Sequence, residues 1–215
     1  MTKGHAVEQC FFDACVEAGV KYDDKEALRG FLAPLRVNGS SAYPHYLHSL
    51  RVGLLSRAIG EFTHHEGRPL LLAGALHDLG KCQVALDVLG KSEGWTARDA
   101  KAIQRHVMDG YRMLSGRFDF SAAIILWHHR FQADGYPKKL PKHLHVYAES
   151  SKLLIVEYGR IIALADVYDA LHRANDKFGA KQELSGEEVR AKMFELNPDR
   201  KKLIAALYDS GIFTV

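Results

Sequence analysis

The stretch LLLAGALHDLGK, residues 70–81, contains the two features that decide the fold. Its first seven residues are apolar or glycine, and they are followed by an imidazole, His77, directly before a carboxylate, Asp78. Polar groups at the edge of a core are destabilising unless each finds a partner. A metal ion satisfies both, because neutral imidazole and ionised carboxylate are ligands and one Asp can bridge two cations. On this dipeptide alone, a helix cap beside a hydrogen-bonded His explains the pattern equally well.

The apolar residues recur at spacings of three and four along most of the chain, which predicts an all-α fold. Helix starts are indicated by Thr96 with Asp99 and by Ser185 with Glu188, both in capping-box spacing. Segment 143–158 departs from this pattern and favours a short β-hairpin insertion. We expect helices near residues 6–18, 25–33, 46–63, 69–79, 97–115, 120–129, 156–173, 186–195 and 198–209.

Length and composition predict a single domain over residues 1–215, with N-terminal helices in 1–45, core motifs in 48–171 and C-terminal helices in 185–210. The formal net charge is +3 with scattered basic residues, which argues against binding to a nucleic acid polymer. The three cysteines form no close-spaced pair, and no apolar run reaches the roughly 18 residues of a membrane span. We therefore expect a reduced, cytoplasmic protein without membrane contact. The unusual feature of the composition is its histidine content, with 12 histidines among 215 residues.

Several of these histidines lie on apolar helical faces. His48 shares a stripe with Val52 and Ile59, and His106 is four residues before Gly110, which would let another helix approach closely. Two more, His128 and His129, end an apolar run, and the carboxylate of Asp166 interrupts another. Each alone is more simply a hydrogen-bonded core residue. One shared cause explains five imidazoles and two carboxylates together, and that cause is a binuclear metal centre.

Taken in order, these segments resemble the HD superfamily of metal-dependent phosphohydrolases, and more closely its HD-GYP subgroup of cyclic di-GMP phosphodiesterases. The resemblance covers residues 48–171 and diverges around the Gly-Tyr-Pro loop. It implies an HD-domain helical bundle and an enzyme that hydrolyses a nucleotide phosphodiester, with cyclic di-GMP favoured. The matching motifs are HSLRV (48–52), HDLGK (77–81) with VLGK (88–91), the segment from Thr96 to His106, HH (128–129) with GYP (135–137), and ADVYDAL (165–171).

The resemblance also implies a site that holds two divalent metal ions. One cation would take His48, His77 and Asp166, the other would take His106, His128 and His129, and Asp78 would bridge them. A shell rich in nitrogen with some oxygen suits iron first and manganese next. Zinc prefers lower coordination and ranks below them.

The expected catalytic residues are Asp78 and Lys81, which lies three positions later and can neutralise phosphate oxygens. By residue type alone, Lys81 would be a solvated lysine near a helix end. The expected substrate-binding residues are Lys81, Arg130, Arg173 and Lys177. Of these, Arg130 replaces the Glu that usually follows the double histidine, and Arg173 and Lys177 are candidates to replace the family's Arg-Pro-Tyr stretch.

Other departures leave alternatives open. Family members with a third metal have a Glu four positions before the first histidine, where this chain has Pro44, so we expect two metals. A diiron oxygenase on the same scaffold is one alternative, and a non-catalytic nucleotide-binding signalling module is another. The sequence leaves the oligomeric state open, and a homodimer is one outcome.

Overall fold

The computed structural model describes residues 3–37, 39–91, 93–142, 146–172 and 184–214 of the chain. Every regular element within these ranges is a helix, which confirms the predicted all-α class. The elements are α1 (Lys3–Glu17), α2 (Tyr22–Leu32), α3 (Tyr43–Phe62), α4 (Gly67–Leu76), the 3₁₀ helix η1 (Leu79–Gln83), α5 (Leu86–Leu89), α6 (Ala97–Gln104), α7 (His106–Leu114), α8 (Asp119–Ile125), α9 (Glu149–Leu171), α10 (Gly186–Leu196), the 3₁₀ helix η4 (Pro198–Arg200) and α11 (Lys201–Asp209).

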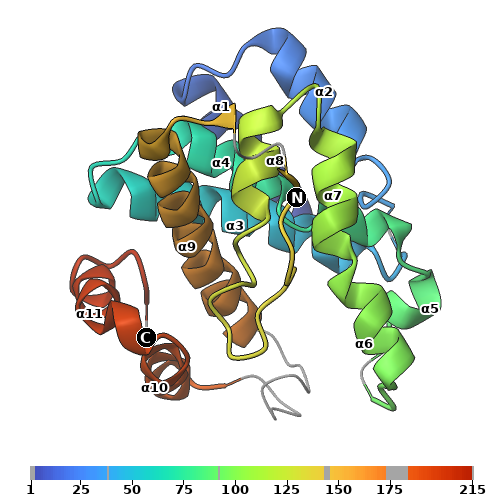
Figure 1. Cartoon of the computed structure of the whole chain (residues 1–215). Coiled ribbons are helices and arrows are strands. Elements are labelled where there is room, and N and C mark those ends of the chain that lie inside the picture. Colours follow the sequence, from blue (N-terminus) through green and yellow to red (C-terminus); the bar gives the residue numbers. More distant parts are fainter. Residues whose placement is uncertain (1–2, 38, 92, 143–145, 173–183, 215) are drawn as a thin grey trace.

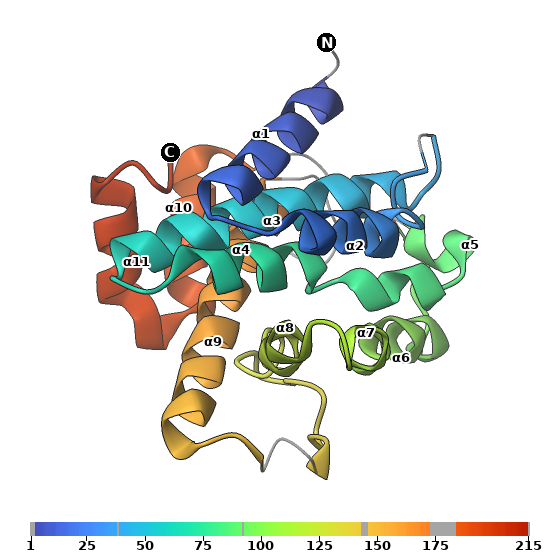
Figure 2. The ribbon, with the colours of Figure 1, turned by 90° about the horizontal axis from the view of Figure 1, so that it is seen from above.

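Helices α3 and α4 lie side by side in the middle of the bundle (Figures 1 and 2). Helix α1 packs on one side of α3, whereas α8 packs on α4 with α7 beside it. Helix α9 crosses this arrangement and contacts α3, α4 and α8. The C-terminal pair α10 and α11 is joined to the bundle through α9 (Figure 1). This packing brings the ends of α4 and α8, the start of α7 and the C-terminal part of α9 toward the same part of α3.

Two glycines let α3 and α4 approach until their backbones touch. A Cβ atom on Gly74 of α4 would lie 2.9 Å from the Cα of Gly53 on α3, and one on Gly53 would lie 2.8 Å from the carbonyl oxygen of Leu71. Both are shorter than real Cβ contacts, so larger residues would force the helices apart. Because His48 is on α3 and His77 directly follows α4, this contact sets the separation of the two histidines.

The predicted helix starts at Thr96 and Ser185 are confirmed. In both capping boxes, the hydroxyl accepts from the backbone N–H of the acidic residue, whose carboxylate accepts from the capping residue's own N–H. The single helix expected over 97–115 is instead two helices, because the chain turns at Arg105 between α6 and α7. Pro198 opens a 3₁₀ turn, η4, that leads into α11.

The prediction of a β-hairpin near 143–158 was wrong. Residues 149–158 form the first part of α9, and residues 143–145 lie outside the described residues. The prediction rested on Val146, Tyr147, Ile155 and Val156 on either side of two serines. In the structure, Ile155, Tyr158 and Ile162 are buried on one face at helical spacing. The opposite side chain, Leu153, is 73% exposed. The helical period of 3.6 residues in the buried side chains therefore outweighed the β propensity of the individual residues.

The C-terminal helices are attached to α9 by two arginine–carboxylate pairs. The buried guanidinium of Arg160 donates to both carboxylate oxygens of Asp199, at 2.6 and 3.0 Å. One turn earlier on α9, Glu157 accepts two hydrogen bonds from Arg200, at 2.5 and 2.8 Å. Paired planar groups of this kind fix geometry as well as contribute energy. Among the described helices, none is both long and apolar enough to cross a membrane.

Candidate metal centre

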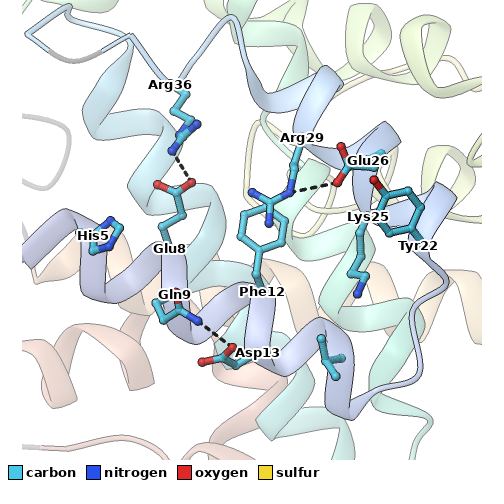
Figure 3. Close-up of a pocket in the computed structure, with 11 residues that line it drawn as sticks. His5, Glu8, Gln9, Phe12, Asp13, Tyr22, Lys25, Glu26, Arg29 and Arg36 are labelled. Carbon is cyan, nitrogen blue, oxygen red and sulfur yellow. Dashed lines mark hydrogen bonds and ion pairs between the residues drawn. The ribbon is translucent and has the colours of Figure 1, made fainter.

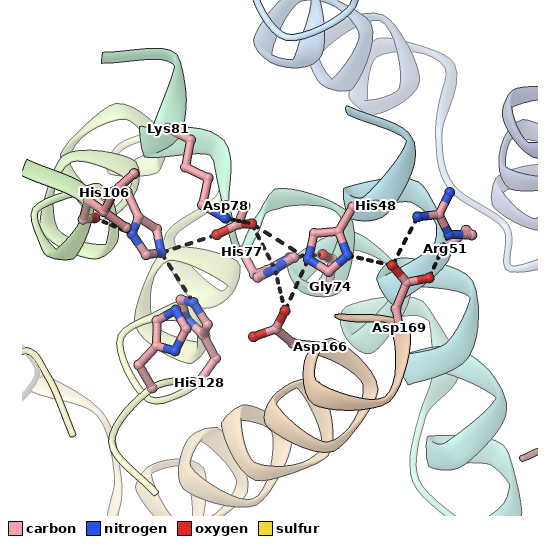
Figure 4. Close-up of polar contacts among 12 residues, drawn as sticks. His48, Arg51, Gly74, His77, Asp78, Lys81, His106, His128, Asp166 and Asp169 are labelled. Atoms are coloured by element: carbon pink, nitrogen blue, oxygen red, sulfur yellow. Dashed lines mark hydrogen bonds and ion pairs between the residues drawn. The ribbon is translucent and has the colours of Figure 1, made fainter. Parts of the chain in front are cut away.

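The structure brings all seven predicted metal ligands into one buried cluster. Figure 4 labels six of them, all except His129. They come from five separate places: α3, the turn between α4 and η1, the start of α7, the turn after α8, and α9. None of the seven is more than 8% exposed. The residues are His48, His77, Asp78, His106, His128, His129 and Asp166.

The cluster divides into two groups around Asp78. On one side, His48, His77 and Asp78 have ligand atoms that all lie within 4.8 Å of one another. Asp166 joins this group, because its Oδ1 lies 3.0 Å from Nε2 of His48 and 3.7 Å from Nε2 of His77. We call His48, His77 and Asp166 centre A.

On the other side, Asp78 forms a second group with His106, His128 and His129, again within 4.8 Å. The Nε2 atoms of His106 and His128 are 3.4 Å apart, and the rings of His128 and His129 have centroids 4.0 Å apart. We call His106, His128 and His129 centre B. Both groups have the residue types and spacing that can hold a divalent cation.

The carboxylate of Asp78 divides its two oxygens between the centres. Oδ1 lies 3.1 Å from Nε2 of His106 in centre B. Oδ2 lies 3.4 Å from Nε2 of His77 and 3.6 Å from Nε2 of His48 in centre A. A carboxylate placed in this way can give one oxygen to each of two cations.

Three of the histidines are oriented by the free carbonyls at helix ends. The Nδ1–H of His77 donates to the carbonyl of Gly74, that of His106 to Ile103, and that of His128 to Ile125, each three residues earlier, at 2.5–2.7 Å. The last carbonyls of a helix have no intrahelical partner, so these acceptors are available there. The bond fixes Nδ1 as the protonated nitrogen and leaves Nε2 for the site.

His48 is oriented differently, because it lies inside α3. Its Nδ1 is 2.7 Å from Oδ2 of Asp169 on α9, and Arg51 donates to both oxygens of Asp169, at 2.5 and 3.0 Å (Figure 4). Neither Arg51 nor Asp169 was predicted as a site residue. Their signal was present in the sequence, since Arg51 is three residues after His48 and Asp169 is three after Asp166, on the same helical faces.

The electrostatics of the cluster favour ionised carboxylates. Burial on its own raises the pKa of Asp78, but Lys81 and His77 lower it well below its usual range. Burial also raises the pKa of Asp166, but the neighbouring His48 and His77 outweigh it and lower the pKa well below its usual range. Burial also lowers the pKa of His77, yet the carboxylates of Asp78 and Asp166 raise it to about 10. The pKa of His128 falls to about 3 through burial and the neighbouring His77 and His106, which keeps this ring neutral.

Known proteins match this arrangement. The HD domain family model covers residues 46–171, which include the whole cluster. The chain belongs to the HD domain family. The predicted superfamily is thus confirmed, and its curated relatives are phosphodiesterases, as the resemblance implied.

One relative of this HD domain is the cyclic di-GMP phosphodiesterase response regulator RpfG of Xanthomonas campestris, 35% identical over 141 residues, covering 63% of this chain and 34% of that protein. Another is a cyclic di-GMP phosphodiesterase of Pseudomonas aeruginosa, 34% identical over 65% of this chain and 33% of that protein. The 3′3′-cGAMP-specific phosphodiesterase 1 of Vibrio cholerae is 30% identical over 69% of this chain and 31% of that protein. The chain spans about a third of the length of these relatives.

A solved structure supports the fold. The HD domain of the L. monocytogenes phosphodiesterase PgpH superposes with a TM-score of 0.57, covering 85% of this chain and 95% of that one. At 17% identity, this similarity concerns the fold alone.

The lysine of the HD motif lies beside the cluster. In η1, Lys81 donates from Nζ to Oδ2 of Asp78 at 2.5 Å, and its side chain is 16% exposed. The ammonium is therefore largely buried against the carboxylate of Asp78. Lys81 is therefore not the solvated lysine that its residue type alone suggested.

Of the other predicted substrate-binding residues, only Arg130 lies within the described residues. Arg130 donates from Nη1 to the carbonyl of Pro137 and packs on Trp127, so it closes the loop that follows the double histidine. Within that loop, the ring of Tyr136 stacks on His129 with centroids 4.5 Å apart. Arg173 and Lys177 lie outside the described residues.

A pocket between α1 and α2 lies outside the cluster and has a different chemistry (Figure 3). Charged side chains in it pair with each other: Arg36 with Glu8 at 2.7 Å, and Arg29 with Glu26 at 3.4 Å. It therefore offers paired charges, whereas the cluster around Asp78 gathers polar atoms that still need a partner.

Proposed function

We propose that this HD domain is a metal-dependent phosphodiesterase that hydrolyses a cyclic dinucleotide, with cyclic di-GMP first among the substrates. The observation that carries the proposal is the carboxylate of Asp78, whose oxygens face two separate sets of histidines. The names of the relatives support the substrate class, since they are phosphodiesterases of cyclic di-GMP and of cGAMP. The same names favour hydrolysis over the oxygenase and signalling-module alternatives.

The residues fit a pair of cations. Nε2 of His77 and Oδ1 of Asp78 are fully buried and have no hydrogen-bond partner. Such atoms are costly in a protein interior unless a ligand satisfies them. Centre A and centre B would each hold one cation, with Asp78 shared between them. Five imidazoles and two carboxylates suit iron first, manganese next and zinc less well.

The chain's own groups prepare the site for a phosphodiester. The chemistry that two bound divalent cations supply is a water of lowered pKa and stabilisation of the attacking and leaving oxygens. Lys81 adds a fixed positive charge next to Asp78, where it can neutralise phosphate oxygens of the substrate. Arg130, Arg173 and Lys177 stay predictions as further contacts to the nucleotide, and Arg130 also shapes the loop.

The test is hydrolysis by anaerobically purified protein whose metal content has been measured. Cyclic di-GMP, 3′3′-cGAMP and a nitrophenyl phosphodiester are each incubated with protein loaded with Fe²⁺ or Mn²⁺ and with chelator-treated protein as the control. We expect turnover of a cyclic dinucleotide by the loaded protein alone. No turnover of any of the three by protein that holds two metals per chain would contradict the proposed function.

A further inference from the structure

One histidine of the cluster, His48, is oriented by a side chain from another helix. His77, His106 and His128 each use a helix-end carbonyl three residues earlier. His48 lies in α3, five residues after the first residue of that helix and well before its end at Phe62. In a helix interior the carbonyls are already taken by the i+4 N–H groups, so an acceptor for Nδ1 must come from elsewhere.

The acceptor comes from α9. Asp169 places Oδ2 at 2.7 Å from Nδ1 of His48, and its side chain is only 10% exposed. A buried carboxylate needs compensating charge, and Arg51 supplies it with two hydrogen bonds to Asp169. Since Arg51 is one turn after His48 on α3, the pair also ties α3 to α9, the helix that carries Asp166.

We propose that Asp169 and Arg51 are a positioning pair that holds His48 ready for a cation and makes centre A the tighter of the two cation positions. The inference rests on the proposed two-cation site but not on the identity of the substrate. A carboxylate that accepts from the far nitrogen of an imidazole fixes the tautomer and makes the ligating nitrogen more basic.

The charges around the two centres also favour tighter cation binding at centre A. Centre A contains the carboxylate of Asp166 and a histidine supported by the carboxylate of Asp169. Centre B contains three imidazoles, of which His106 and His128 are supported by neutral backbone carbonyls. Both centres share Asp78, and Arg51 compensates the charge of Asp169. The carboxylate of Asp166 is therefore the difference in negative charge that favours binding of a divalent cation at centre A.

The experiment measures cation binding without substrate. Metal-free wild-type protein and Asp169→Asn are titrated with Mn²⁺, and free Mn²⁺ is followed by electron paramagnetic resonance. Asn is close in size to Asp and keeps an acceptor oxygen, so the fold is retained while the charge is removed. We expect two sites in the wild type, and in the variant a loss of about 10- to 100-fold in affinity at the tighter site only.

A matched control lies on the same helix. Glu157→Gln weakens a comparable pair with Arg200, far along α9 from the ligands, and should bind both ions as the wild type does. If Asp169→Asn lowers stability, Arg51→Lys provides a second variant, which keeps the positive charge but loses the paired geometry; we expect a smaller loss at the tighter site.

A spectroscopic measurement separates positioning from a structural role. With Zn²⁺ as a diamagnetic probe, the Nδ1–H proton of His48 should be strongly downfield and slow to exchange in the wild type and lose both properties in Asp169→Ala, while those of His77 and His128 stay unchanged. Equal affinities of wild type and Asp169→Asn, or equal weakening of both ions, would overturn the inference. Two tightly bound ions without turnover would contradict only the proposed function.

Discussion

Centre A and centre B face the same carboxylate but are built from different kinds of sequence segment. The ligands of centre B come from residues 106–129, and His106 and His128 are oriented by carbonyls three residues away. The ligands of centre A span residues 48–166, and they meet only because α3, α4 and α9 pack together. The difference teaches that centre B depends mainly on local backbone geometry, whereas centre A depends on tertiary packing and on a supporting ion pair.

The change with the largest expected effect removes the carboxylate of Asp78, which both centres share. Asp78→Ala should abolish tight binding of both cations and reduce cyclic dinucleotide hydrolysis by about a thousandfold or more, because the lost interactions amount to several kcal/mol. Metal analysis and initial rates measure the two effects. The control is Asp87→Ala, an exposed acidic residue on α5. Retention of two ions by Asp78→Ala would mean that the centres are independent.

A second change separates centre B from Asp78 without replacing any of the seven side chains of the cluster. A Cβ on Gly80 would lie 1.9 Å from the carbonyl oxygen of His106 and 2.6 Å from the amide nitrogen of Gly110, so Gly80→Ala must push α7 away from η1. We expect a loss of about 3 kcal/mol in the free energy of unfolding, measured with urea.

The control for that change is Gly30→Ala in α2, where an added Cβ meets nothing within 4 Å. This variant should be unchanged or more stable by up to about 1 kcal/mol. Equal stabilities of Gly80→Ala and Gly30→Ala would show that the close contact between η1 and α7 does not position His106.

A third change tests the positive charge of Lys81 beside the carboxylate of Asp78. Lys81→Gln should lower kcat by about 100-fold while both cations stay bound, since it removes a donor for phosphate oxygens and keeps the ligands. The matched control is Lys91→Gln, which breaks a similar pair with Asp99, at 2.6 Å, outside the cluster. A Lys81→Gln variant with wild-type kcat would assign Lys81 to the structure of η1 alone.

The smallest expected effect is a difference in proton release between the centres. In the metal-free chain the pKa of His77 is about 10, so this ring is protonated at pH 7 and must lose its proton to bind a cation. His128, with a pKa of about 3, is already neutral. Binding of a cation at centre A should therefore release about one proton from His77 at neutral pH, whereas binding at centre B should release none from His128.

Calorimetry in two buffers with different ionisation enthalpies measures this release. Replacing His77 with Ala should remove the proton release of centre A, and replacing His128 with Ala should leave it in place. Proton release that persists in His77→Ala would contradict the assigned charge state.

The sequence predicted which side chains gather around Asp78 more completely than it predicted what surrounds them. His128 follows an apolar helix, and His106 lies three residues after Ile103 and four before Gly110. Gly110 indicated a close helix contact, which the structure shows against Gly80. Asp169 and Arg51 were missed, because their importance depends on α3 meeting α9 across more than a hundred residues. The start of α9 was misread because β-branched and aromatic residues such as Tyr147, Ile155 and Val156 fit a strand and a helix equally until burial is known.

The central claim is that Asp78 joins two cation positions. A crystal of the protein soaked with Mn²⁺ and measured by anomalous diffraction tests it directly. We predict two anomalous peaks, one bounded by His48, His77 and Asp166 and the other by His106, His128 and His129, with one oxygen of Asp78 on each. A single peak, or two peaks that share no oxygen-bearing group at Asp78, would contradict the account.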